Sequence, residues 1–141
     1  MTMKKLGVAM VAVMMTSTAI GANWVEIGEA KDKAFIHSLD IDSVRKLNTY
    51  SKQISYFVKN DYSKAQKTAD GKYYNYDVVQ FEGDCENNRV SLIGAINYTK
   101  NGSVVNSYNW SDYDWETVFP DTVGEKHLNA ACYVAGYRDT P

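Results

Sequence analysis

Residues 89–110 read RVSLIGAINYTKNGSVVNSYNW and predict a β-hairpin. Apolar residues and a glycine occupy alternate positions from Val90 to Tyr98, which is the two-residue period of a strand that turns one face toward a core. Asn101 and Gly102 then supply the positive φ angles that a tight turn needs. Residues 104–110 return as the partner strand, so the two strands of this hairpin are expected to be antiparallel.

Four more strands are predicted on the N-terminal side of the hairpin, at residues 24–27, 34–39, 50–59 and 73–81. Within 50–59, the side chains of Ile54, Tyr56 and Val58 share one face of the strand. Residues 82–84 (Glu-Gly-Asp) are interpreted as an interruption after the fourth of these strands. Six strands joined mainly by short turns predict an antiparallel sheet.

The C-terminal part of the chain changes to a helical period. Apolar residues recur there with spacings of three and four, at Leu128, Ala131, Cys132 and Ala135. Thr122 and Glu125 match a capping box, and Gly136 is expected to end the helix. The predicted fold is therefore α+β and mostly β, with about six antiparallel strands and a C-terminal helix packed on the sheet.

The N-terminus has the pattern of an export signal. Lys4 and Lys5 precede an uninterrupted apolar run at residues 6–15, and small residues allow cleavage after Gly21 or Ala22. We expect residues 1–22 to be a signal peptide and residues 23–141 to form a single domain. The alternative is an uncleaved N-terminal anchor, although the apolar run is short for a membrane span.

Export fixes the expected location and redox state of the protein. We expect it in the periplasm, at the cell surface or secreted, without a lipid anchor because no cysteine lies near the cleavage region. The only two cysteines, Cys85 and Cys132, would then meet an oxidising compartment and form one disulfide. That bond would join the helix to the sheet. Two free thiols or a metal pair are the alternatives, and neither cysteine has a nearby cysteine or histidine partner.

The charge balance argues against a general nucleic-acid-binding protein. The chain has 15 basic and 17 acidic residues, and removal of Lys4 and Lys5 with the signal changes the net charge from −2 to −4. A nucleic-acid-binding domain would carry a net basic face.

Catalytic chemistry has little support in the sequence. The two histidines are His37, inside a predicted strand, and His127, assigned to the polar side of the helix, and their separation is not a metal-ligand spacing. Two carboxylate clusters have the alternate spacing of a calcium site, but neither matches the twelve-residue calcium loop: Glu82, Asp84 and Glu86, and Asp112, Asp114 and Glu116. No catalytic, cofactor-binding or metal-binding residue is predicted, and the chain is not expected to be an enzyme.

One segment has a net positive charge although the chain as a whole is acidic. Residues 59–76 carry four lysines against two aspartates, interleaved with tyrosines. Tyrosine with lysine and small polar residues is typical of an adaptable contact surface. The alternative is a long polar hairpin loop whose tyrosines belong to a strand face, since strands favour tyrosine in any case. The candidate partner surface comprises Lys59, Tyr62, Lys64, Lys67, Lys72, Tyr73, Tyr74 and Tyr76.

The order of several short segments resembles the surface-adhesin protein E family of Gram-negative bacteria. These segments are residues 24–28 (WVEIG), 40–44 (DIDSV), 56–59 (YFVK), 84–85 (DC) with Arg89, Tyr98, 102–107 (GSVVNS), 119–125 (FPDTVGE) and 131–132 (AC). The resemblance implies an antiparallel sheet with a C-terminal helix lying on it and a disulfide that joins them. It also implies a non-enzymatic protein that binds host extracellular-matrix or serum proteins.

Three classes of function stay open. The first is an exported, adhesin-like binding protein with a protein partner, either a host matrix or serum protein or a periplasmic protein. The alternative is a periplasmic inhibitor or small-ligand-binding protein, for which a rigid disulfide-stapled sheet is a suitable scaffold. An enzyme is a third possibility that would require a closed pocket holding His37 with a carboxylate. No cofactor, nucleic acid, membrane span or oligomeric state is indicated by the sequence.

Overall fold

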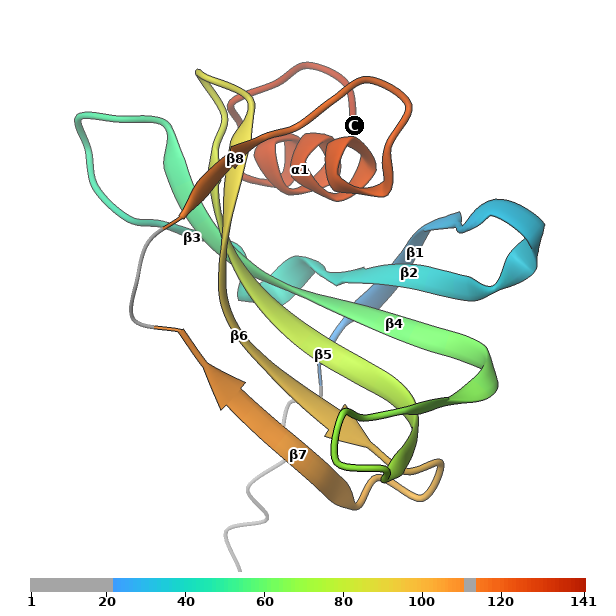
Figure 1. The fold of residues 1–141 in the computed structure, drawn as a ribbon. Coiled ribbons are helices and arrows are strands. Elements are labelled where there is room, and N and C mark those ends of the chain that lie inside the picture. The colour runs from blue at the N-terminus through green and yellow to red at the C-terminus, as the bar shows by residue number, and fades with distance from the viewer. Residues whose placement is uncertain (1–21, 111–113) are drawn as a thin grey trace, which may run out of the picture.

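A computed structural model describes residues 22–110 and 114–141 of the chain (Figure 1). The predicted signal peptide lies outside the described residues except for Ala22, and Asp112 of the second carboxylate cluster also lies outside them. No helix within the described ranges combines the length and the apolar character needed to cross a membrane.

The described residues form one antiparallel sheet, with neighbouring strands in the order β1-β2-β4-β5-β6-β7. The strands of this path are β1 (Trp24–Glu29), β2 (Phe35–Asp40), β4 (Gln53–Lys67), β5 (Tyr73–Asp84), β6 (Arg89–Tyr98) and β7 (Val104–Asn109). Two short strands, β3 (Arg45–Lys46) and β8 (Trp115–Thr117), pair with β4 and β6. Two short 3-10 helices, η1 (Lys31–Lys33) and η2 (Ile41–Ser43), follow β1 and β2. The prediction of a mostly β, antiparallel fold is confirmed.

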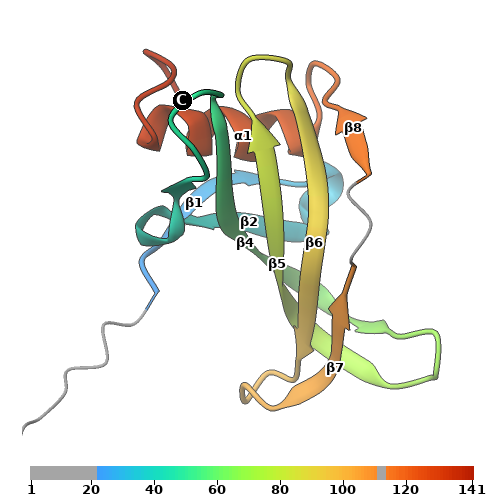
Figure 2. The ribbon, with the colours of Figure 1, turned by 90° about the vertical axis from the view of Figure 1, so that its left-hand side faces the viewer.

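The helix α1 spans Val123–Val134 and has the predicted ends. The Thr122 hydroxyl accepts a hydrogen bond from the Glu125 amide at 3.3 Å, and Gly136 adopts a φ of +82° just beyond the helix. Figure 2 shows α1 crossing one end of the sheet, while β4, β5 and β6 continue well past it. The helix therefore covers only part of one face of the sheet.

The core lies between α1 and that end of the sheet. Its most buried side chains are at most 1% exposed and come from both layers: Leu39, Ile54, Tyr56 and Val58 from strands, and Leu128, Ala131 and Cys132 from the helix. The predicted inward face of residues 50–59 and most of the predicted helical stripe are confirmed.

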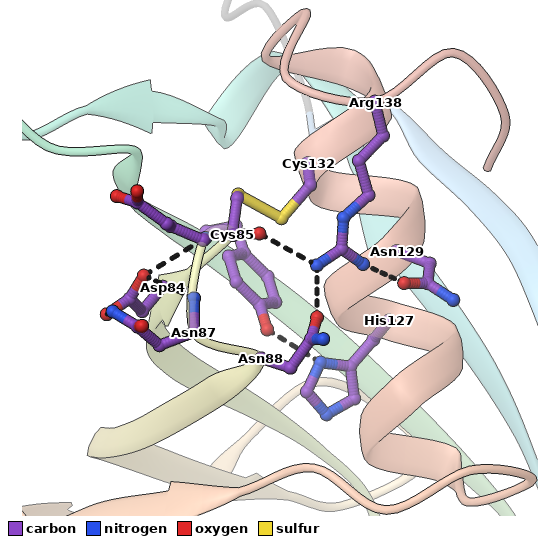
Figure 3. The surroundings of a disulfide bond; sticks show 10 residues. Asp84, Cys85, Asn87, Asn88, His127, Asn129, Cys132 and Arg138 are labelled. Carbon is purple, nitrogen blue, oxygen red and sulfur yellow. Dashed lines mark hydrogen bonds between the residues drawn. A yellow bond between two sulfur atoms is a disulfide. The ribbon is translucent and has the colours of Figure 1, made fainter.

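The predicted disulfide is present and joins the two layers. Cys85 follows β5, and its Cα atom lies 5.8 Å from that of Cys132 in α1 (Figure 3). The Arg138 guanidinium braces the same corner, because it donates hydrogen bonds to the Cys85 carbonyl oxygen at 3.1 Å and to the side chains of Asn88 and Asn129. A covalent bond and a charge-assisted hydrogen-bond cluster thus fix the helix to one end of the sheet.

Three local predictions need correction. The strand predicted at 50–59 extends to Lys67, and β5 continues through residues 82–84 without interruption. A Cβ atom on Gly83 would lie 2.6 Å from Cδ1 of Leu128, so this glycine permits close approach of the helix and does not form a turn. In the β6–β7 turn, Gly102 has a φ of +85° but Asn101 keeps a negative φ, so the pair does not form a two-residue turn of positive φ angles.

Candidate binding surface

The sheet continues beyond α1 as a projecting hairpin, here called the β4–β5 arm and defined as residues 59–76. It exists because β4 and β5 are 15 and 12 residues long, more than the helix can cover. A turn closes its tip, in which the Thr68 amide donates to the Lys72 carbonyl at 2.7 Å and Gly71 adopts a φ of +86°. The arm extends away from α1 in both ribbon views (Figures 1 and 2).

One side of the arm carries a stacked aromatic pair with a lysine beside it. The Tyr76 and Tyr98 rings stack with centroids 4.9 Å apart, and the Lys59 ammonium lies 4.9 Å from the Tyr76 centroid. The same ammonium is 3.5 Å from a carboxylate oxygen of Asp61. A shallow hollow of about 460 Å³ opens here, lined by Lys59, Asp61, Tyr62, Ser63, Asn75, Tyr76 and Lys100. Lys59 and Tyr76 are therefore held in fixed positions beside a concave surface.

The tip of the arm presents the remaining lysines to solvent. The Lys67 ammonium lies 5.8 Å from the ring centroid of Tyr73, which is 61% exposed. Lys72 is 3.4 Å from a carboxylate oxygen of Asp70, and Lys64 is exposed, with no carboxylate within 4 Å in the described ranges. Hydrogen bonds from Thr68 and then from Asn106 lower the pKa of Asp70 to about 2. The tip thus keeps one stable negative charge among three exposed lysines.

The other two predicted tyrosines contribute to the rigidity of the arm. The Tyr62 hydroxyl donates a hydrogen bond of 2.8 Å to Asp77, and the Tyr62 and Tyr74 rings meet edge to face with centroids 5.8 Å apart. Burial and the nearby charge of Asp77 raise the pKa of Tyr62 well above its usual range. All eight predicted residues lie within the arm as it is defined, but they are divided among the hollow, the tip and the Tyr62–Tyr74 pair, and the Tyr62 hydroxyl bonds to Asp77 within the protein.

A largely buried polar row lies where the arm leaves the core, and the sequence interpretation missed it: His37, Asp77 and Asn97 are buried and Asn60 is half-buried. His37, Asn60, Asp77 and Asn97 are paired across β2, β4, β5 and β6. Nδ1 of His37 is 2.8 Å from Oδ1 of Asn60, and Nδ2 of Asn60 donates to Asp77 at 2.8 Å. The sequence contained part of the signal for this row. Asn60 lies two residues after Val58 and Asp77 lies two residues before Val79, so both belong to the inward face of their strands. The sequence did not show that these residues pair across strands.

The row fixes the protonation of His37. Since the Asn60 amide nitrogen donates to Asp77, its oxygen must accept, and Nδ1 of His37 therefore carries the proton. Burial lowers the pKa of His37, whose Nε2 has no hydrogen-bond partner in the part of the chain that the structure describes. Burial also raises the pKa of Asp77, although hydrogen bonds from Asn60 and Tyr62 act in the opposite direction. His37 and Asp77 are both less than 8% exposed, so a substrate at the protein surface could not reach them as a catalytic pair.

The prediction that His127 lies on the polar side of the helix is wrong. This residue is 4% exposed and points from α1 toward the sheet (Figure 3). Its Nδ1 is 2.7 Å from the Tyr56 hydroxyl, and its ring stacks on Phe81 with centroids 4.5 Å apart. The sheet buries a wider sector of α1 than the predicted stripe because the aromatic rings of β4 and β5 reach the first turns of the helix. Burial, followed by the charge of His37, lowers the pKa of His127 to about 3.

Asp84, from the first carboxylate cluster, closes a turn between strands. Asp84 accepts hydrogen bonds of 3.1 Å from the Glu86 and Asn87 amides and pairs with Arg89 at 2.9 Å. Burial acts to raise the pKa of Asp84, but the hydrogen bonds from Asn87, Arg89 and Glu86 together lower it. Among the residues described, no three or more His, Cys, Asp or Glu side chains are grouped in a way that could hold a metal ion.

Three solved structures with a similar fold are of one protein. The structure of Haemophilus influenzae protein E aligns with a TM-score of 0.56 at 15% identity, over 79% of this chain and 85% of that one. Its crystal form II gives a TM-score of 0.55 at 12% identity, over 82% and 98% of the two chains. Protein E from non-typeable Haemophilus influenzae gives 0.52 at 14% identity, over 85% and 90%. At these identities the likeness concerns the fold alone.

Sequence comparison gives a more specific result. No curated protein matches the sequence. The family model for surface-adhesin protein E matches residues 24–133, which include every strand and nearly all of α1. The match covers well over half of the sequence, and the chain therefore belongs to the surface-adhesin protein E family.

Proposed function

We propose that this chain is an exported adhesin-like protein that binds a host extracellular-matrix or serum protein through the β4–β5 arm. Membership of the surface-adhesin protein E family supports the adhesin-like character and a non-enzymatic role. The observation that carries the choice of surface is the arm itself, a projecting hairpin with exposed lysines and immobilised tyrosines.

The tyrosines are suited to supply affinity. Large aromatic side chains contribute much of the binding energy of protein interfaces, and they lose little conformational entropy when they are already fixed. Tyr76 is held between Tyr98 and Lys59, and Tyr74 is held against Tyr62. Tyr73 is the most exposed of the three and lies beside Lys67 at the tip.

The lysines of the arm are suited to attract a partner electrostatically before contact. Lys64, Lys67 and Lys72 are exposed on a chain whose formal net charge is negative, so they create a local positive patch. Such a patch accelerates encounter with an acidic partner and makes association sensitive to salt. The partner is therefore expected to present an acidic surface.

Surface-plasmon resonance on a panel of host matrix and serum proteins tests this proposal. Against a partner that binds, Lys64→Glu should slow association several-fold at low salt and have less effect at high salt. Tyr73→Ala should accelerate dissociation by roughly tenfold, the equivalent of about 1.4 kcal/mol. The matched controls are Lys52→Glu and Tyr50→Ala, which alter exposed residues outside the arm and should leave the kinetics unchanged.

Unchanged kinetics in both arm variants, with circular dichroism showing an intact fold, would place the binding surface elsewhere. Treatment of intact cells with an external protease tests the location independently. A protein that is fully protected from the protease would remove the premise of host binding. The periplasmic inhibitor or small-ligand-binding alternative would then take precedence.

A further inference from the structure

An apolar groove lies between β1 and α1, outside the β4–β5 arm. Its volume is about 630 Å³, and Val25, Ile27 and Leu39 from the sheet face Ala130, Tyr133 and Val134 from the helix across it. Val25, Tyr133 and Val134 are 43%, 47% and 42% exposed, so the groove leaves large apolar side chains in water. Tyr133 and Val134 belong to the face of α1 beside the one that packs on the core, and Val25 lies on β1.

One wall of the groove is a free sheet edge. β1 is the first strand in the sheet order, and within the described ranges it pairs only with β2. A shift in register between Glu26 and Gly28 interrupts its ladder, so residues 24–26 form the regular part of the edge. An edge strand presents unpaired backbone N–H and C=O groups, and an extended peptide can add to it as a further strand.

Among the described residues, Lys126 is the cation that lines the groove. The Lys126 stem lies on the backbone of β1, since a Cβ atom on Gly28 would be 3.2 Å from Cδ and 3.4 Å from Nζ of that lysine. No carboxylate of the described residues lies within 4 Å of this ammonium. Glu26 also lines the groove, but strand alternation directs its side chain to the face opposite Val25. The groove therefore complements a negative charge beside β1.

We propose that the groove between β1 and α1 binds an extended segment of a partner protein, paired with residues 24–26. Alternate apolar side chains of that segment would lie against Tyr133 and Val134, and a carboxylate would meet Lys126. We favour this occupant over a helix or an acyl chain because the groove combines a free strand edge beside a helix, an apolar floor and an unpaired lysine. The site is separate from the arm and does not depend on it.

Selection from a random dodecapeptide library displayed on phage, with the purified protein as bait, tests the proposal. Enriched peptides should alternate apolar and polar residues and contain an acidic residue. Their affinity should fall at least tenfold with Tyr133→Ala and with Lys126→Glu, while Lys126→Arg should retain it. The arm variant Lys64→Glu should bind them normally, so failure here and failure of the arm proposal are distinguishable.

Pairing of the peptide with β1 as a strand can be tested separately, with N-methylated peptides. N-methylation of alternate peptide amides should abolish binding in one register and leave it unchanged in the other, because only one set of amides faces β1. Near-UV circular dichroism confirms that each variant is folded. The proposal is overturned by no enrichment, by enriched peptides that bind all variants equally, by indifference to N-methylation in both registers, or by a helical spacing of their apolar residues.

Discussion

Gly83 shows how a single residue sets the distance between the helix and the sheet. It lies opposite Ile54 in β4, and a Cβ atom there would meet Leu128 at 2.6 Å and Tyr56 at 3.1 Å. Both neighbours are at most 1% exposed, so neither can move aside into solvent. The absence of a side chain at this position allows α1 to pack directly on β5.

Replacement of this glycine should strain the core. We expect Gly83→Ala to lower the free energy of unfolding by roughly 1–3 kcal/mol, the usual effect of overpacking. Chemical denaturation of the purified protein measures it. Gly124→Ala is the matched control, because the nearest atoms to its Cβ would be 3.8 Å away and alanine favours the helix. Equal stability of the two variants would show that the helix can shift without loss of packing.

At the scale of elements, α1 contacts the rest of the fold on one side only, unlike the central strands. Each central strand pairs on both sides, whereas the helix rests on one face of the sheet and is tied there by Cys132 and by Arg138. The Cys85–Cys132 bond links residues 47 apart in sequence, so it restricts the unfolded chain considerably. The helix is therefore the element whose stability depends most on the disulfide.

Loss of the disulfide should be costly. We expect Cys85→Ala combined with Cys132→Ala to reduce the free energy of unfolding by roughly 2–5 kcal/mol. Thermal and urea unfolding measure this, with the reduced wild-type protein as the control that keeps both sulfur atoms. Mass spectrometry of the unreduced wild-type protein should find no free thiol. Detection of two thiols would contradict the predicted bond.

Elements with a local signal were predictable, and those that depend on pairing were not. The alternation of Ile54, Tyr56 and Val58 and the cap at Thr122 are encoded within a few residues, and both are confirmed. β3 and β8 have two and three residues, too few to show a period, and they form only by pairing with longer strands. The interpretation of residues 82–84 as an interruption of the strand failed because Gly83 makes room for a helix that is distant in sequence.

The candidate surface was predictable as a composition and not as an arrangement. The excess of lysine and tyrosine in residues 59–76 could be counted. That Tyr76 would stack on Tyr98 while Tyr62 bonds to Asp77 depends on strand register, which cannot be read from the local pattern of one segment. The same holds for the buried polar row, whose members come from different strands.

At the scale of the whole molecule, two buried neutral histidines link folding to pH. Burial lowers the pKa of both His37 and His127, the latter to about 3, below the ordinary value of 6.5. The unfolded chain therefore binds more protons than the folded one below pH 6.5. Histidine-linked stability is fully present above that pH and is lost as pH falls toward the folded pKa. Asp77, whose pKa is raised, acts in the opposite sense and partly offsets the loss near pH 4.

We expect the free energy of unfolding to decrease from pH 7 to pH 4, with His127 alone contributing up to about 1.4 kcal/mol per pH unit. Urea unfolding at a series of pH values measures the slope. His127→Gln keeps a hydrogen-bonding side chain near Tyr56 and removes the titrating group, so its slope should be shallower than that of the wild type. An unchanged slope would mean that His127 does not take up the proton.

The disulfide also determines what a protease can separate. Cys85 and Cys132 enclose the β6–β7 hairpin and its Asn101–Gly102 turn, so a cut in that turn leaves two fragments that remain covalently attached. The β4–β5 arm lies outside the enclosed loop and stays on the N-terminal fragment. A protein cleaved there should migrate as one band on a non-reducing gel and as two after reduction. Cleavage at this turn alone would therefore not release the arm from the rest of the molecule.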